Sequence, residues 1–163
     1  MNVASVMSSH IITTSPGTPV SELWRLLFVK HINAIPVIDR SRSLLGIITK
    51  EDLLQGLYPD YQEYFLDATG VADFEVMENK VREMGSKTAG DIMNKKVIYT
   101  RADTPIMRAL SRMIVRSLNQ LPVLSDDNTV IGMITKGDIF KALFKKTLIK
   151  QKVQKKAKKR KKA

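Results

Sequence analysis

The sequence contains no cysteine and only two histidines, His10 and His31. A chain without cysteine has no disulfide, no thiolate metal site and no cysteine nucleophile. Two histidines give little material for an imidazole relay or a transition-metal site. We therefore predict no metal site and no catalytic residue, and the lack of cysteine is typical of a reducing compartment.

Long apolar runs are also absent. No stretch approaches the roughly 18–20 residues that cross a bilayer, and the apolar run Leu23–Val29 is interrupted by Arg25. The opening residues MNVASVMSSHIITTSPG have neither a basic start nor a clean apolar core. We therefore expect no transmembrane segment, no signal peptide and a cytoplasmic location. Hydrophobic residues make up 44% of the chain, which is enough for a folded core.

Acidic residues are missing from the last part of the sequence. Residues 145–163 hold eleven basic residues and no acidic ones. Taking these eleven from the total of 27 leaves sixteen basic residues against sixteen acidic ones, so the net charge of +11 belongs to the tail. One interpretation is that Lys145–Lys162 binds RNA or another acidic partner. The other is a solvated extension without a target.

An internal repeat organises the neutral body. An offset of 86 residues aligns INAIPVIDRSRSLLGIITKED (Ile32–Asp52) with LNQLPVLSDDNTVIGMITKGD (Leu118–Asp138) without a gap. The match extends upstream to Thr18–Pro19 and Thr104–Pro105. Two copies are too few for a solenoid. We therefore predict a duplicated unit whose halves pack around a pseudo-two-fold axis.

Each copy predicts the same order of elements: strand, helix, strand, strand, helix. The boundaries are expected at 1–57 and 88–144 for the two copies, 58–87 for a helical linker and 145–163 for the tail. A Thr–Pro pair begins each first helix, because threonine caps well and proline suits the first turn. The expected elements are strands His10–Thr14 and Val97–Thr100, helices Pro19–His31 and from Pro105, strands Ala34–Ile38 and Gln120–Leu124, strands Leu44–Ile48 and Val130–Ile134, and helices from Thr49 and Thr135.

A Thr-x-x-Asp sequence opens the second helix of each copy, at Thr49–Asp52 and Thr135–Asp138. One interpretation is structural, since this pattern forms a capping box. The other is a ligand site, because helix N-termini bind phosphate and a nearby carboxylate accepts hydrogen bonds from ribose hydroxyls. Lys50 and Lys136 add positive charge at the same place.

The residues IPVID…GIITKEDLL and LPVLS…GMITKGDIF resemble the CBS domain, and their tandem arrangement resembles a Bateman module. The resemblance covers about Val3–Leu57 and Ala89–Phe144. It implies an α+β fold of two tandem βαββα domains packed around a pseudo-two-fold axis. Leu148, Ile149 and Val153 continue an apolar stripe, which predicts that the last helix extends into the basic tail.

The resemblance also implies a function. It implies a regulatory module, not an enzyme, that binds AMP, ADP, ATP or S-adenosylmethionine in the clefts between its two domains, with no cofactor. The implied ligand-binding residues are Thr49, Lys50, Asp52, Ile35 and Pro36 in the first copy and Thr135, Lys136, Asp138, Leu121 and Pro122 in the second. The alternative is an RNA- or anionic-surface-binding protein that uses the basic tail, with the CBS pair as a dimerisation scaffold.

CBS pairs also resemble one another in forming flat homodimers through apolar helix faces. The second helix of each copy offers such a face, made of Leu53, Leu54, Leu57, Ile139, Phe140 and Leu143. The linker Tyr58–Lys87 is longer than a minimal connection. It is expected either to cover one ligand cleft or to add to the dimer surface.

Overall fold

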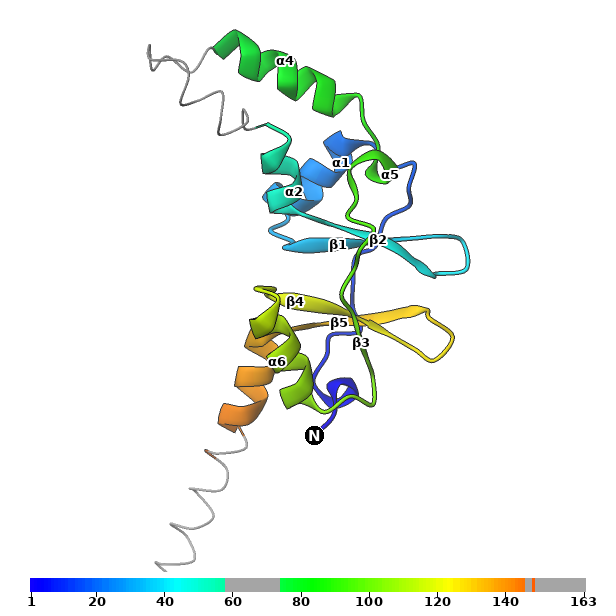
Figure 1. Cartoon of the computed structure of the whole chain (residues 1–163), viewed down its shortest axis with the longest axis vertical. Helices are drawn as coiled ribbons and strands as arrows, with labels where there is room; N and C mark the ends of the chain where they lie inside the picture. Colours follow the sequence, from blue (N-terminus) through cyan, green and yellow to red (C-terminus); the bar gives the residue numbers. More distant parts are fainter. Residues whose placement is uncertain (58–73, 146–147, 149–163) are drawn as a thin grey trace, which may run out of the picture. The chain divides into compact units, whose positions relative to one another are not determined.

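The structure is a computed structural model, and it describes residues 1–57, 74–145 and 148. The chain divides into two compact units, which are drawn in Figure 1. The N-unit is Ile12–Val97. The C-unit combines Met1–Ile11 with Ile98–Ala163. Each unit therefore contains most of one sequence copy and the first residues of the other.

The N-unit is built on an antiparallel pair of strands, β1 (Ala34–Ile38) and β2 (Leu44–Thr49). Thr14 adds a single parallel bridge at Val37, and its N–H donates to the Pro36 carbonyl at 3.0 Å. Pro36 has no backbone N–H to donate. Proline is tolerated here because the single-residue bridge from Thr14 requires few donors on that side of β1.

Three helical segments pack on this sheet. They are α1 (Val20–Trp24), the π-helical turn η2 (Arg25–Val29) and α2 (Lys50–Gln55). Their inward residues follow helical spacing and are buried with residues of both strands. The buried core of the N-unit consists of Val20, Leu23, Leu27, Ile35, Val37, Ile48, Leu53, Met84 and Ala89.

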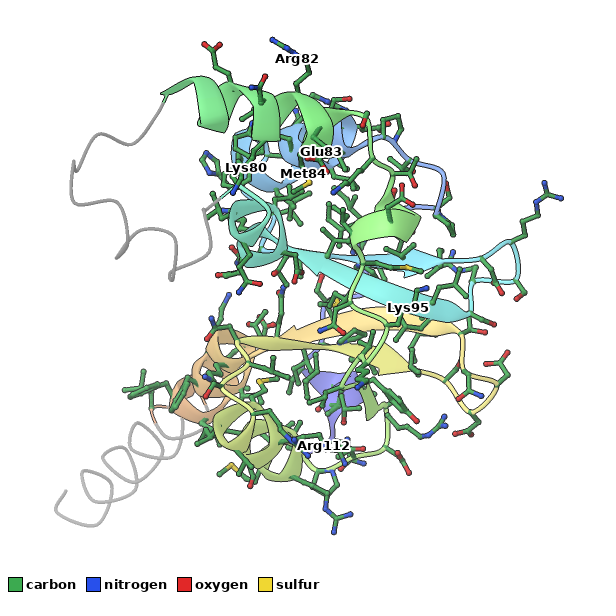
Figure 2. The ribbon with its side chains drawn as sticks, turned by 45° about the horizontal axis from the view of Figure 1, so that its top comes forward. Lys80, Arg82, Glu83, Met84, Lys95 and Arg112 are labelled. Carbon is green, nitrogen blue, oxygen red and sulfur yellow. The ribbon has the colours of Figure 1, made fainter. Side chains whose placement is uncertain are left out.

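A further helix, α4 (Phe74–Gly85), comes from the segment between the two copies and lies over α1 and α2 in Figure 1. Figure 2 shows Met84 pointing from α4 into the N-unit, whereas Arg82 points away from it. Met84 is 8% exposed, and a Cβ on Gly56 would lie 1.8 Å from its terminal methyl carbon. The end of this linker is thus part of the N-unit core.

The C-unit holds a three-stranded sheet in the order β3–β4–β5. Here β3 (Thr100–Arg101) runs parallel to β4 (Gln120–Leu124), and β4 is antiparallel to β5 (Val130–Thr135). Two helices pack on the sheet, α6 (Ile106–Val115) and a helix over 136–145. The buried core of the C-unit consists of Val3, Ile106, Ala109, Leu110, Met113, Leu121, Val123, Ile134 and Ile139.

The 86-residue offset of the sequence repeat also relates the pairings inside the two units. Ala34 faces Thr49 in the N-unit, and Gln120 faces Thr135 in the C-unit. The bridge from Thr14 has its counterpart in Thr100 of β3. The repeat detected in the sequence is therefore a repeat of strand register.

The first residues of each copy belong to the unit built from the other copy. The 3-10 turn η1 (Val3–Ser5) is in the C-unit, and the short helix α5 (Ala89–Ile92) is in the N-unit. Val3 and Ala89 are equivalent in the repeat, and both are fully buried. The compact units are consequently divided near residues 11 and 97, whereas the sequence copies were divided near 57 and 88.

Two glycines make room for these exchanged segments. Ser8 pairs with Met133 beside Gly132, and Asn94 pairs with Ile47 beside Gly46. A Cβ on Gly132 would lie 2.7 Å from the Ser8 carbonyl oxygen, and one on Gly46 would lie 2.6 Å from the sulfur of Met93. A side chain at either position would collide with the crossing segment, which explains the glycine in each copy.

Several expected boundaries differ from the structure. The helix expected over Pro19–His31 changes to π geometry at Arg25, where the Lys30 N–H donates to the Arg25 carbonyl at 3.1 Å. His31 then takes a left-handed φ of 55°, which stops the helix. The strand expected over His10–Thr14 is only the bridge at Thr14, and β3 begins at Thr100.

Two expectations lie partly outside the described residues. The continuation of the last helix through Ile149 and Val153 falls on residues that are not described, although Leu148 is helical. The expectation that the linker Tyr58–Lys87 covers a cleft or adds to the dimer surface falls partly on residues 58–73, which are not described either. In the described part, no helix combines the length and apolarity needed to cross a membrane.

Candidate functional site

The candidate site of the N-unit lies where β2 passes directly into α2. Thr49 ends the strand and is the N-cap of the helix. Its N–H and its hydroxyl both donate to Asp52 Oδ2, at 2.7 and 2.8 Å, and its hydroxyl accepts the Asp52 N–H at 3.3 Å. This is the capping box that the sequence predicted as the structural interpretation.

The C-unit repeats this geometry at the junction of β5 and the helix over 136–145. The Thr135 N–H and hydroxyl donate to Asp138 Oδ2 at 2.9 and 2.7 Å. The Asp138 N–H donates back to the Thr135 hydroxyl at 3.0 Å. Thr49, Asp52, Thr135 and Asp138 are all half-buried, so each box is accessible from solvent.

Only one oxygen of each aspartate takes part in the box. The capping bonds end on Oδ2 of Asp52 and of Asp138, which leaves Oδ1 of each carboxylate outside the box. A carboxylate carries about four acceptor sites in all. Capping and ligand binding are therefore compatible roles for the same side chain. The threonine hydroxyls, by contrast, already use their single proton within the box.

The two lysines of the motifs have different neighbours. The Lys50 ammonium lies 5.7 Å from the centroid of the Phe28 ring, and that ring is stacked on Trp24 at 4.1 Å. The Lys136 ammonium contacts Asn119 Oδ1 at 3.4 Å, and its backbone N–H donates to the Asn119 carbonyl at 3.0 Å. A repeated sequence has thus produced two chemically different surroundings.

The residues predicted on the neighbouring strand contribute in another way. Ile35 pairs with Ile48 and Pro36 with Ile47, so both lie within two register positions of Thr49. The Ile35 and Leu121 side chains are fully buried in their cores, and Pro36 and Pro122 are buried as well. Any contact from these four residues to a ligand must therefore come from backbone atoms.

Sequence reasoning missed a third box of the same kind. Thr88 and Asp91 cap α5, and the Thr88 N–H and hydroxyl donate to Asp91 Oδ2 at 2.8 Å each. The pKa of Asp91 is lowered mainly by the hydrogen bond from the Thr88 backbone. The hydrogen bond from the Thr88 hydroxyl and the charge of nearby Lys87 lower it further. The signal in the sequence was the Thr-x-x-Asp pattern itself, which occurs four times. Its fourth occurrence, Thr100–Asp103, lies in β3 and the turn after it and opens no helix. Phe28 and Asn119 were also missed as lysine partners, since their proximity depends on the fold.

In the described part of the chain, no group of three histidine, aspartate or glutamate side chains is arranged to hold a metal ion. Asp52 and Asp138 each give one carboxylate oxygen to a helix cap.

Strand–helix junctions of this kind occur twice in register, at Thr49–Asp52 and at Thr135–Asp138. The model of the CBS domain family matches the chain twice, over residues 3–58 and 89–145. The chain therefore belongs to the CBS domain family and contains a tandem CBS pair.

Similar proteins include both small and large chains. An uncharacterized protein of Methanocaldococcus jannaschii is 25% identical over 155 residues, which cover 88% of this chain and 91% of that protein. The homoserine O-acetyltransferase of Methanohalobium evestigatum is 27% identical over 137 residues, which cover 84% of this chain but 23% of that enzyme. The chain thus spans less than a quarter of the enzyme's length.

Solved structures show the same fold. The crystal structure of CBSX2 in complex with AMP is 24% identical, with a TM-score of 0.70 and coverage of 90% of this chain and 98% of that chain. A CBS domain pair in complex with 5-methylthioadenosine and S-adenosyl-L-methionine is 25% identical, with a TM-score of 0.64 and the same coverage.

Proposed function

We propose that the chain is a regulatory module that binds an adenosine-type ligand, either AMP, ADP or ATP or S-adenosylmethionine. The observation that carries this proposal is the repeated strand–helix junction, where Asp52 and Asp138 each hold an oxygen outside the capping box. The similar CBS pair crystallised with 5-methylthioadenosine and S-adenosyl-L-methionine supports the ligand class.

In this proposal each residue has a specific role. Oδ1 of Asp52 and of Asp138 accepts hydrogen bonds from the ribose hydroxyls. Lys50 and Lys136 stay close to the negatively charged groups of a nucleotide, while Thr49 and Thr135 contact phosphate only by exchanging a capping bond. Ile35, Pro36, Leu121 and Pro122 contact the ligand through the backbone, because their side chains are buried.

We propose sensing rather than catalysis. The enzymes among the similar proteins share only the CBS part, which is 23% of the acetyltransferase. Within the described residues, the polar groups at the two junctions are hydrogen-bonded to each other as caps. A change of ligand occupancy would then act on a partner, and we expect the protein to work in the cytoplasm.

Calorimetry and thermal unfolding of the whole chain test this proposal directly. AMP, ADP, ATP and S-adenosylmethionine are added separately, with guanosine monophosphate as the control for base identity. At least one adenosine ligand should release or absorb heat and raise the melting temperature, because a ligand that binds only the folded state stabilises it by mass action. If none of the four ligands gives a heat of binding or raises the melting temperature, the chain is not an adenosine sensor.

We also propose that the module forms a homodimer. Leu53 and Ile139, expected on the dimer face, are fully buried in their cores and are excluded from it. Leu54 and Phe140, also expected on that face, are exposed at 37% and 48%. The N-unit exposes Trp24 and Val29 as well, at 41% and 64%. Light scattering should show a dimer, and the double change Val29→Glu and Leu54→Glu should give a folded monomer. A wild-type monomer at tens of micromolar would contradict this.

A further inference from the structure

The positive charge of the chain is concentrated in the C-unit. Residues 98–163, which belong to this unit, hold seventeen basic and four acidic residues, whereas the N-unit holds ten basic and twelve acidic ones. The tail accounts for eleven of the seventeen, but four arginines lie within 98–116, which the structure describes. That stretch contains a single acidic residue, Asp103. A partner attracted by positive charge would therefore meet the C-unit.

Three of these arginines form a stripe along α6. Arg108, Arg112 and Arg116 recur every four residues, so they lie on one face of the helix and its C-cap. All three are exposed, and within the described residues none of them pairs with a carboxylate. Arg112, labelled in Figure 2, donates to the Tyr99 carbonyl at 2.6 Å. The arginine stripe therefore runs along α6 where the helix passes the start of β3.

The arginine stripe is distinct from the exposed apolar face of α6. Met107 and Ile114 are exposed at 55% and 61%, and they lie seven residues apart and hence on one face. At 3.6 residues per turn, this face lies about 150° around the helix from Arg112. A homodimer that buries the apolar face would not need to cover the arginine stripe.

The fold does not require the arginine stripe. Like charges four residues apart on a helix repel each other and destabilise the helix. The 86-residue repeat places Glu22, Leu26 and Lys30 at the equivalent positions of the N-unit, where the charges are mixed. An accumulation of arginines that costs stability and is confined to one copy indicates a surface that binds an anion.

An exposed aromatic ring lies at the same place. Ile98 packs on the C-unit core and Thr100 is 1% exposed, whereas Tyr99 between them is 39% exposed. The Arg101 guanidinium lies 5.9 Å from the centroid of the Tyr99 ring, and it donates to Asn128 Oδ1 at 2.9 Å. The ring is thus supported by a fixed neighbour, and the carbonyl of the same residue contacts the arginine stripe.

Arginines beside an exposed ring favour a single-stranded nucleic acid among the possible anions. The guanidinium group binds phosphate through two parallel hydrogen bonds and stacks on flat rings, which an ammonium group does not do. Aromatic side chains stack on unpaired bases, whereas the bases of a duplex are already stacked on each other. An acidic protein would use the arginines but has no base to place on Tyr99. A lipid surface would need the apolar face of α6, which lies elsewhere on the helix.

We propose that α6 and the residue before β3 form a binding site for single-stranded nucleic acid. Arg108, Arg112 and Arg116 contact the phosphates, and Tyr99 stacks on a base. The basic tail adds attraction that does not depend on base sequence. None of these residues belongs to the Thr-x-x-Asp sites, so the proposal does not depend on adenosine binding.

Fluorescence anisotropy of a labelled oligouridylate, titrated with the whole chain at several salt concentrations, tests this site. Arg108→Gln with Arg116→Gln removes two phosphate contacts and should lower the affinity at least about tenfold near 0.1 M salt. The slope of log K against log salt concentration should become shallower by about 1.4, because each contact to a single strand contributes about 0.7. Arg108→Lys with Arg116→Lys keeps both charges and should keep the slope.

Lys30→Gln with Arg82→Gln is the matched control. It removes the same net charge from the chain, at two exposed positions of the N-unit. The slope should stay that of the wild type, because charges that contact no phosphate release no counterions.

The tyrosine is tested separately from the charges. Tyr99→Ala should lower the affinity about tenfold through loss of one stacked base, without changing the salt slope. Tyr99→Phe keeps the ring and should retain the affinity. Thermal unfolding and light scattering verify that each variant keeps the fold and the oligomeric state of the wild type. Any shift that an adenosine ligand gives to the melting temperature of the wild type should persist in every variant.

Three results would overturn the proposal. The first is no binding of oligouridylate at low salt. The second is binding that neither the glutamine changes nor Tyr99→Ala weakens, which would assign the attraction to the tail alone. The third is arginine-dependent binding for which polyglutamate competes better than unlabelled oligouridylate of equal charge, which would assign the arginine stripe to an acidic protein.

Discussion

At the scale of single residues, three aspartates have the same capping geometry but different expected roles. Asp52 and Asp138 lie at the proposed ligand sites, and Asp91 caps α5. Changing Asp52 or Asp138 to alanine should weaken ligand binding by about 1.5–3 kcal/mol, the range for a hydrogen bond to a charged group. The same changes should lower the free energy of unfolding by about 0.5–2 kcal/mol through loss of the cap.

Asp91→Ala is the matched control for these variants. It removes the same kind of cap and should reduce stability without changing ligand affinity. Calorimetry and urea unfolding of the three variants separate the two effects. Unchanged affinity in both Asp52→Ala and Asp138→Ala would leave these residues with a capping role alone.

The two close-approach glycines are expected to respond unequally to alanine. At Gly132 the new Cβ meets the backbone oxygen of Ser8 at 2.7 Å, and this oxygen is held by its pairing with Met133. Gly132→Ala should therefore lower the free energy of unfolding by about 1–3 kcal/mol, as overpacking does. At Gly46 the atoms met belong to the flexible Met93 side chain, so Gly46→Ala should cost less. Urea unfolding checks this order, and a larger loss at Gly46 would contradict it.

At the scale of elements, the turns of the two hairpins are organised by aspartates. Asp39 Oδ1 accepts the Ser41 hydroxyl at 2.7 Å and the N–H groups of Ser41 and Ser43 at 2.9 Å each. Asp127 accepts the hydroxyl of Ser125 and the N–H of Thr129. The Ser41 side chain is the main cause of a lowered pKa for Asp39, and the Ser125 side chain is the main cause for Asp127.

These shifts predict how the turns respond to pH. A carboxylate whose pKa is lower in the folded state than in the unfolded state stabilises the fold at pH values above its unfolded-state pKa, which is near 3.8. That contribution is lost as the pH falls through the lowered folded-state pKa. NMR titration should place the midpoints of Asp39 and Asp127 below 3.8. Ser41→Ala should move the Asp39 midpoint upward, and no movement would contradict the hydrogen-bond explanation.

Some of the helices and strands can be predicted from the sequence, and others cannot. Ala34–Ile38 and Gln120–Leu124 were located to the residue because each is a short apolar run bounded by polar residues and repeated at a fixed offset. The π turn at Arg25–Val29 was not predicted, because apolar spacing alone does not distinguish it from a regular helix.

The candidate sites show the same limit. The Thr-x-x-Asp pattern located both capping boxes, because a box is made by residues three positions apart. The partners of Lys50 and Lys136 could not be found in this way. Phe28 precedes Lys50 by 22 positions and Asn119 precedes Lys136 by 17, and only the fold brings them close.

At the scale of the whole molecule, the sequence could not predict that the first segment of each copy packs in the unit built from the other copy. Val3–Ser5 and Ala89–Ile92 are too short to show a helical period, and the repeat assigns each to its own copy. Their destination depends on long-range packing, because Val3 and Ala89 complete cores formed mainly by the other copy. The sequence repeat and the folding unit are therefore different divisions of one chain.

This difference predicts which fragments fold. A fragment of Ile12–Val97 contains the complete N-unit, including the buried Met84 and Ala89 and the pairing of Asn94 with Ile47. It should unfold cooperatively in urea, because its core retains all its buried residues.

A fragment of Met1–Leu57, which follows the sequence copy, should fail to do so. It lacks Met84 and Ala89, which are 8% and 0% exposed in the intact chain, and it carries Val3 without the C-unit core in which Val3 is buried. Removing two core side chains of this kind leaves a cavity, and a small domain has little stability to spare. Circular dichroism and urea unfolding of both fragments compare them under one condition. Cooperative unfolding of Met1–Leu57 with a midpoint equal to that of Ile12–Val97 would show that the exchanged segment is dispensable, and the division of the chain at residues 11 and 97 would then have no energetic meaning.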